Sequence, residues 1–166
     1  MTLDDQVLDP EQFMVFCFLS RTVSYRSVLK TFNLLKAHGL TTRQGLKGSS
    51  QEQVHRLLKR SGYRFHNKMA ECLMEWSMNT IVLASATREE LCEIKGIGMK
   101  LSSMFLNRTR GEQHLILDVH IKRWLKRQGL LGKNYLESEK NFRMEAERRG
   151  VTPVQLDYAI WETYRK

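Results

Sequence analysis

The sequence contains no long apolar run and no recognisable targeting segment. No uninterrupted apolar stretch approaches the roughly 18 residues of a transmembrane helix, so we expect no membrane span and no membrane partner. The first residues, MTLDDQVLDPEQ, are acidic and lack the basic-then-apolar order of a signal peptide. Both absences predict a cytoplasmic protein.

Cysteine is also scarce. The three cysteines, Cys17, Cys72 and Cys92, are far apart in the chain and odd in number. They match no zinc or iron–sulfur spacing and suggest no disulfide framework. Reduced and mostly buried thiols are the simplest interpretation, although a catalytic thiol stays open.

The chain has only 2 prolines and 10 glycines, and its apolar residues recur at helical spacing. Strand-like alternation and internal repeats are missing from the sequence, so we predict an all-α protein. The predicted helices cover 10–21, 25–39, 51–61, 63–79, 88–94, 98–110, 118–128, 135–149 and 152–166, with a loop at 40–50. Ser50, Thr87 and Thr152 are expected to begin helices, and Gly39 and Gly62 to end them.

Positive charge is what the sequence has in excess. It contains 27 Lys and Arg against 18 Asp and Glu, which gives a net charge of +9 and a pI near 9.7. Such an excess favours a polyanionic partner, most often nucleic acid. The basic clusters would either line a DNA channel or form solvated helix faces; they are Arg56-Lys59-Arg60, Arg64-Lys68 and Lys122-Arg123-Lys126-Arg127.

The stretch LCEIKGIGMKLSS, residues 91–103, places Gly96 and Gly98 on either side of Ile97. Because glycine weakens a continuous helix, we expect two helices joined by a tight turn, whose glycines allow positive φ and close approach of a partner. The second helix would then present its N–H groups and positive dipole end to a phosphate. An ordinary corner, with glycines for packing and Ile97 between the helices, is the alternative.

Two polar residues follow this turn at a suggestive spacing. Lys100 is expected at the edge of a buried helix face, where partial desolvation favours the neutral, nucleophilic amine. Asp118 lies 18 residues later, after the apolar HLIL, and is expected to cap the next helix. A helix N-terminus keeps a carboxylate ionised. Together, a lysine and an aspartate across a short loop can attack and stabilise an electrophilic sugar carbon.

These segments resemble a known superfamily. LCEIKGIGMKLSSMFLNR followed by LILDVHIKRWLKRQGL resembles the helix–hairpin–helix DNA glycosylases, which include endonuclease III. The chain is most similar to the archaeal-type 8-oxoguanine DNA glycosylase/AP lyases, in its GYRF–N–K–A and KGIG–K blocks and in its terminal VTPVQLDYAIWETYRK. The resemblance covers about residues 10–166. No cysteine follows Cys92, so the four-cysteine cluster of endonuclease III is not expected.

The resemblance implies a two-lobed helical fold with an active site in a central cleft. Lobe one would cover about 22–117, and lobe two would combine 1–21 with 118–166. Lys100 stands at the position of the family's nucleophile and Asp118 at that of the aspartate that activates it. The other site residues implied are Gly96, Gly98 and His120 for the DNA backbone, and Trp161, Lys166 and Phe65 for the base pocket.

The implied reaction is excision of 8-oxoguanine from duplex DNA through a lysine Schiff base, followed by β-elimination at the abasic site. The resemblance implies a monomer that requires no cofactor and has no metal ligands, apart from a monovalent cation at the hairpin. Its expected location is the cytoplasm, at the nucleoid.

Other interpretations stay open. The chain is also compatible with a glycosylase for oxidised pyrimidines, or with a non-catalytic module that uses the hairpin to hold DNA. His120 is as well explained by a structural capping role as by a phosphate contact, and Phe65 and Trp161 by positions in the core.

Overall fold

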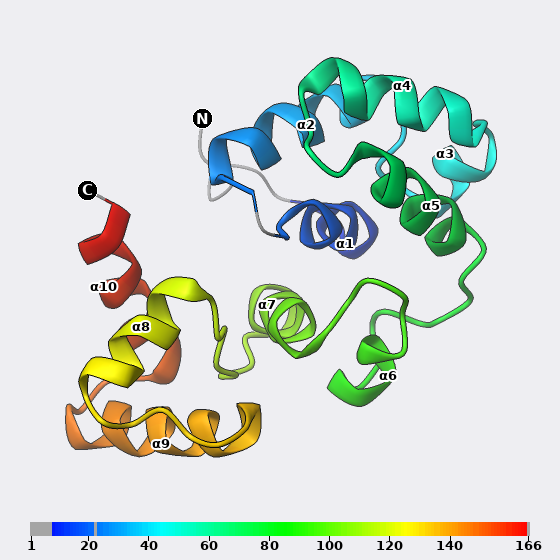
Figure 1. Cartoon of the computed structure of the whole chain (residues 1–166). Helices are drawn as coiled ribbons and strands as arrows, with labels where there is room; N and C mark the ends of the chain where they lie inside the picture. Colours follow the sequence, from blue (N-terminus) through cyan, green and yellow to red (C-terminus); the bar gives the residue numbers. More distant parts are fainter. Residues whose placement is uncertain (1–7, 22, 166) are drawn as a thin grey trace. The chain divides into compact units, whose positions relative to one another are not determined.

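The computed structural model describes residues 8–21 and 23–165, and the regular elements in that part of the chain are all helices (Figure 1). The prediction of an all-α protein is confirmed. The chain forms two compact units, Met1–Ile97 and Gly98–Lys166. The first contains α1 (Pro10–Leu19), α2 (Tyr25–Ala37), α3 (Arg43–Lys47), α4 (Gln51–Ser61), α5 (His66–Ser77) and α6 (Arg88–Cys92). The second contains α7 (Met99–Arg110), α8 (Val119–Arg127), α9 (Tyr135–Arg148) and α10 (Pro153–Arg165).

Helix starts and ends follow the predicted signals. Ser50 accepts a hydrogen bond from the Gln53 N–H, and Thr87 forms a complete capping box with Glu90. The Thr152 N–H donates to the Gln155 side chain and the Gln155 N–H donates to the Thr152 hydroxyl, which fixes the start of α10. Gly39 and Gly62, which follow α2 and α4, have φ of 69° and 79°, as helix-ending glycines require.

The prediction of a loop at 40–50 is wrong, because the short helix α3 forms there. Thr42 caps it by accepting from the Gly45 N–H at 3.1 Å. Contacts with distant residues hold its first residue, Arg43, whose backbone N–H and Nε both donate to the carboxylate of Glu11. Such contacts leave no pattern in the local sequence.

The core of the first unit is built around α1. Every residue from Phe13 to Leu19 is buried, and α2 and α5 both pack against this helix (Figure 1). The Phe16 ring meets that of Phe32 edge-on at 5.6 Å between centroids, and Trp76 of α5 is also buried. A helix without a polar face must be surrounded. This helix is therefore central within its unit.

The second unit has a smaller core between α8, α9 and α10. Both α8 and α9 contact α10. The buried side chains come from these helices and from the segment before α8; they are Leu115, Ile121, Leu125, Phe142, Ala146, Leu156 and Ile160. This core sets the position of α8, which begins directly after Asp118.

The compact units divide the chain between Ile97 and Gly98, inside the predicted hairpin. The predicted lobes, 22–117 and 1–21 with 118–166, are drawn differently and stay a prediction. Among the helices of residues 8–21 and 23–165, none combines the length and apolar character needed to cross a membrane.

Candidate active site

The segment 91–103 forms the expected turn between α6 and α7. Its two glycines differ in conformation. Gly96 has φ of 96°, which favours glycine, whereas Gly98 is extended with φ of −118° and ψ of −175°. The expectation of positive φ is therefore confirmed for Gly96 and wrong for Gly98.

Contacts within the chain explain Gly96. A Cβ there would lie 1.9 Å from a guanidinium nitrogen of Arg21, whose Nε donates to the Gly96 carbonyl at 3.3 Å. No atom of the described residues lies within 4 Å of the corresponding Cβ position at Gly98. Neither backbone strain nor packing within that part of the chain requires glycine at Gly98.

The start of α7 has the features of an anion site. Gly98 is its N-cap residue and has no side chain to accept a hydrogen bond. In α1, α2, α4, α8 and α9, by contrast, the N-cap side chain accepts a bond from a backbone N–H of the first turn; these residues are Asp9, Ser24, Ser50, Asp118 and Asn134. The helix has 12 residues, so its positive end carries a full dipole contribution. An anion near Gly98 would take the place of the missing cap.

Lys100 lies in the first turn of α7 and is half-buried. The helix buries Leu101 and Phe105, whereas Met104 is only half-buried. Ser102 and Ser103 complete the inner face instead. The predicted place of Lys100 at the edge of a buried face is therefore what the structure has.

Asp118 caps α8, as predicted. Its Oδ1 accepts from the N–H groups of His120 and Ile121, both at 2.8 Å. Asp118 is half-buried, and both bonds go to Oδ1. Its other oxygen, Oδ2, is therefore the one that could accept a proton or face a positive charge.

Tyr135, the first residue of α9, connects the two candidate residues, and sequence reasoning missed it. Its hydroxyl donates to the Leu115 carbonyl and accepts from the Leu117 N–H at 3.3 Å, directly before Asp118. The same oxygen lies 3.5 Å from the Met99 carbonyl and 3.4 Å from Ser103 Oγ, which flank Lys100 on α7. One hydroxyl thus joins the turn that carries Lys100 to the segment that ends in Asp118.

Further bonds fix the same loop. The Glu139 carboxylate accepts from the Leu115 N–H at 2.9 Å, and the Asn107 side chain exchanges two bonds with the His114 backbone. These residues leave the loop little freedom to vary the distance between α7 and α8.

Asp157 of α10 is a second carboxyl group beside Asp118, and it too was missed. The pKa of Asp157 is raised from 3.8 to about 7, chiefly by burial and then by the negative charge of Asp118, while a backbone hydrogen bond from Ile116 opposes the shift. Its Oδ2 is buried without a hydrogen-bond partner in the part of the chain that the structure describes. A raised pKa keeps Asp157 in its neutral acid form at pH values where an ordinary aspartate is charged.

His120 is the second residue of α8, and its backbone N–H serves the Asp118 cap. Its ring lies 5.5 Å from that of Tyr164, between centroids. The ring Nδ1 is buried and has no partner among the described residues. A phosphate contact by His120 stays a prediction.

The predicted base pocket is divided between the units. Phe65 is the N-cap residue of α5 in the first unit, and the Arg64 guanidinium lies 5.3 Å from the centroid of its ring. Trp161 of α10, in the second unit, is half-buried beside Tyr158, with 6.4 Å between ring centroids. Lys166 lies outside the described residues. That these three residues border one pocket stays a prediction.

Comparison with known proteins decides the family. The family model for 8-oxoguanine DNA glycosylase, with its helix–hairpin–helix, matches residues 8–151. The chain belongs to this family. The match includes the hairpin, Lys100, Asp118 and Tyr135.

Curated members of the 8-oxoguanine DNA glycosylase family are similar over much of the chain. The 8-oxoguanine DNA glycosylase/AP lyase of Thermoplasma acidophilum is 30% identical over 163 residues, which cover 89% of this chain and 76% of that protein. The protein of the same name from Thermotoga maritima is 33% identical over 126 residues, which cover 66% of this chain and 61% of that protein.

Solved structures of the family are similar in fold. The 8-oxoguanine DNA glycosylase of Thermotoga maritima matches with a TM-score of 0.76 and 29% identity, over 92% of this chain and 77% of that one. The Methanocaldococcus jannaschii 8-oxoguanine glycosylase/lyase, in complex with a 15mer DNA containing 8-oxoguanine, matches with a TM-score of 0.74 and 26% identity, over 92% and 78%. An endonuclease III–DNA structure, at 18% identity and a TM-score of 0.70, shares the fold, so the helix–hairpin–helix glycosylase fold is confirmed.

The Asp157 carboxyl group predicts an unusual dependence of stability on pH. Because its pKa is higher in the folded chain than in the unfolded one, protonation favours folding. Its contribution is fully present below 3.8 and is lost as pH rises to about 7, a change of roughly 4 kcal/mol at most. Asp157→Asn mimics the protonated form, so its melting temperature relative to wild type should rise between pH 5 and pH 8. An equal difference at both values would show that Asp157 is not a raised acid.

Proposed function

We propose that this protein excises 8-oxoguanine from duplex DNA and then cleaves the strand at the resulting abasic site. The observation that carries the proposal is the placement of Lys100 and Asp118 in one compact unit, on helices whose connecting loop is tied by Tyr135. Membership of the 8-oxoguanine DNA glycosylase family supports the substrate. The proposed partner is double-stranded DNA that contains a damaged base or an abasic site.

The proposed chemistry begins with a nucleotide turned out of the helix. The Lys100 amine attacks C1′ of the sugar, the bond from C1′ to the base breaks, and the base leaves with the bonding electrons and takes up a proton. Asp118 stabilises the positive charge that develops on the sugar and accepts the proton lost by the amine. The sugar ring then opens: the C1′–O4′ bond breaks, O4′ takes up a proton, and the nitrogen lone pair forms the C=N bond of a protonated Schiff base. The Schiff base acidifies the C2′ hydrogen, and loss of that proton expels the 3′ phosphate and cuts the strand.

Asp157 gives Asp118 a defined role in this scheme. With its pKa raised to about 7, Asp157 keeps its proton at acidic pH, while the Asp118 carboxyl group accepts two N–H bonds at a helix start. The pair therefore presents one negative charge to the sugar rather than two.

The hairpin is proposed to bind the DNA backbone without reading sequence. Gly98 leaves open space before the start of α7, where its lack of a side chain would let a phosphate approach the backbone N–H groups. Gly96 shapes the turn, and His120 would add a second backbone contact.

A monovalent cation at the hairpin fits only part of the turn. The Gly96 carbonyl already accepts from Arg21, whose guanidinium charge opposes a cation at that oxygen. The Ile94 carbonyl accepts from the Ile97 N–H but retains a second lone pair. A cation would therefore use Ile94 and carbonyls other than that of Gly96, and no chemical step requires it.

Base recognition is proposed to use Phe65 and Trp161 as apolar walls and Lys166 at the rim. The site would discriminate by an acceptor aimed at the N7–H that guanine lacks, since guanine would leave it unpaired at a cost of about 1–3 kcal/mol. The protein is proposed to act as a monomer, in the cytoplasm, at the nucleoid.

Borohydride trapping tests the function and the nucleophile together. The wild type should form a covalent complex with duplexes that carry 8-oxoguanine or an abasic site, and Lys100→Gln should form none while still binding both. Asp118→Asn should slow single-turnover excision by about 100-fold or more, because it removes the charge that stabilises the sugar cation. Release of oxidised pyrimidines but not of 8-oxoguanine would overturn the substrate. Binding without trapping on any duplex would leave a non-catalytic DNA-binding module.

The hydroxyl of Tyr135 should affect chemistry more than binding. Tyr135→Phe keeps the ring but releases the loop from α7, so single-turnover excision at saturating protein should slow about tenfold or more, since small displacements of reacting groups are costly. The dissociation constant for undamaged duplex should stay within about twofold. Tyr63→Phe is the matched control, because its buried hydroxyl donates to the Leu19 carbonyl in the other unit. Equal loss of excision in both variants would mean that Tyr135 only stabilises the fold.

Gly98→Val tests the proposed hairpin contact. The extended backbone at Gly98 accepts valine and no atom of the described residues opposes its Cβ, so the melting temperature should change little. A backbone hydrogen bond to a phosphate is worth about 1.5–3 kcal/mol, so without it the dissociation constants for damaged and undamaged duplexes should rise alike, by about tenfold or more. Unchanged affinity would place the phosphate elsewhere.

A further inference from the structure

The positive charge of the chain is concentrated in one segment. Residues 21–70 contain 11 Lys and Arg and a single acidic residue, Glu52. The rest of the chain contains 16 Lys and Arg and 17 Asp and Glu. The largest share of the net charge of +9 therefore comes from α2, α3, α4 and the start of α5, although residues 98–128 also carry 7 Lys and Arg against 2 Asp and Glu.

Most of this charge is on the surface. Arg21 and Arg43 are used internally, against the Gly96 carbonyl and the Glu11 carboxylate. The other nine basic side chains of the segment are exposed; they are Arg26, Lys30, Lys36, Lys47, Arg56, Lys59, Arg60, Arg64 and Lys68. We call these nine residues the basic surface. It forms because α2 and α4 pack their apolar faces against each other and leave their charged faces outward.

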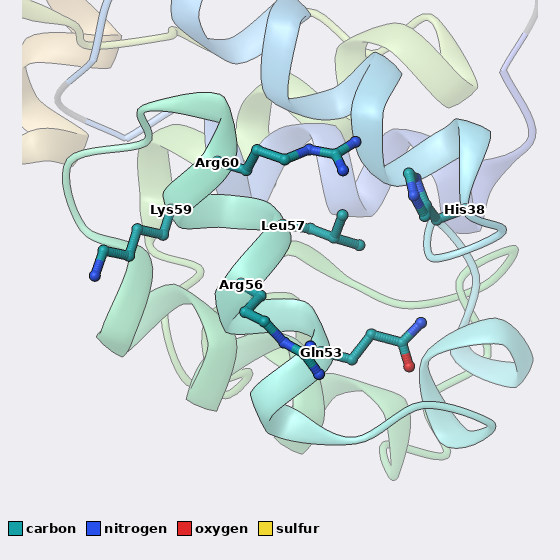
Figure 2. A pocket seen from close by; sticks show the side chains of 6 residues that line it. All are labelled: His38, Gln53, Arg56, Leu57, Lys59 and Arg60. Atoms are coloured by element: carbon teal, nitrogen blue, oxygen red, sulfur yellow. The ribbon is translucent and has the colours of Figure 1, made fainter.

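A pocket lies within the basic surface, between the end of α2 and the face of α4 (Figure 2). Its volume is about 620 Å³, and its lining consists of His38, Gln53, Arg56, Leu57, Lys59 and Arg60. Leu57, only 7% exposed, forms an apolar floor. In Figure 2, Arg60, Leu57 and Gln53 extend from α4 toward the side of His38, whose Nδ1 is fixed by a 2.8 Å bond to the Leu34 carbonyl.

This lining suits a sugar-phosphate backbone. Arg56 and Arg60 are one turn apart on α4, and a guanidinium group can donate to two oxygens of one phosphate at once. Leu57 offers an apolar surface to a deoxyribose, and Gln53 offers a neutral amide donor. The lining residues include no carboxylate that would repel a phosphate. We propose that this pocket binds a backbone phosphate of duplex DNA, as a second contact separate from the hairpin.

The second contact would serve a need that the hairpin leaves unmet. The hairpin is proposed to bind through backbone groups, and residues 91–103 themselves carry only Lys95, Lys100 and Glu93, so the hairpin alone supplies little long-range attraction. The basic surface supplies that attraction and releases counterions when it binds. The inference rests on the proposed action on duplex DNA, but its test uses undamaged duplex and needs no excision.

The test compares two full-length triple variants of equal charge change. One replaces Arg56, Lys59 and Arg60 with glutamine; the control replaces Lys133, Lys140 and Arg143, which are exposed in the second unit. Binding of an undamaged duplex is measured by fluorescence anisotropy between low and physiological salt. The pocket variant should bind about tenfold more weakly at low salt, with a salt slope lower by about 1 for each phosphate that it no longer neutralises.

The same variants separate the remaining explanations. If the two variants weaken binding equally, the effect is one of general charge and the proposal is wrong. The proposal is also wrong if the pocket variant binds duplex as tightly as the wild type does. Inorganic phosphate alone, added at constant ionic strength, should shift the amide resonances of α4 far less than an equal concentration of duplex phosphates. If inorganic phosphate saturates the pocket while the pocket variant binds DNA normally, the site takes a free anion and the proposal is wrong. If the wild type binds duplex through the pocket but excises no lesion, only the proposed function fails.

Discussion

The hydroxyl of Tyr135 lies against the first turn of α7 and against both ends of the short segment that leads into Asp118. A lysine nucleophile and an aspartate that are 18 residues apart in the chain act together only if the loop between them has a single geometry. The bonds of Glu139 and Asn107 to the same loop serve this purpose, but only Tyr135 touches α7, the loop and its approach to Asp118 at once. The proposed chemistry depends on that contact.

Electrostatics then assigns the roles of the two carboxyl groups. Asp118 sits at the positive end of α8 with two N–H donors, whereas Asp157 is buried beside it with one oxygen unpartnered in the described part of the chain. Each group raises the energetic cost of the other's charge. The environment raises the pKa of Asp157, so Asp157 is the carboxyl group that keeps its proton, and Asp118 is the one proposed to face the developing sugar cation.

Local signals predicted most of this architecture. Capping residues such as Thr87 and Thr152, and the apolar residues of α1, act within one or two turns of chain, so the sequence displays them directly. The Asp118 cap and the positive φ of Gly96 belong to the same class.

What could not be predicted depends on contacts between distant segments. Helix α3 relies on the bonds of Arg43 to Glu11, 32 residues away. Tyr135 and Asp157 have the pattern of ordinary helix residues until α9 and α10 are packed around the loop and α8. The extended backbone of Gly98 was misjudged because glycine in a turn usually signals positive φ.

The central claim is that Lys100 forms the covalent bond to the sugar. The most direct measurement is mass spectrometry of the tryptic peptides from a borohydride-reduced complex with 8-oxoguanine duplex. The account predicts one modified peptide, with the sugar remnant on Lys100 Nζ. A remnant on any other lysine, or on the N-terminal amine, would contradict it.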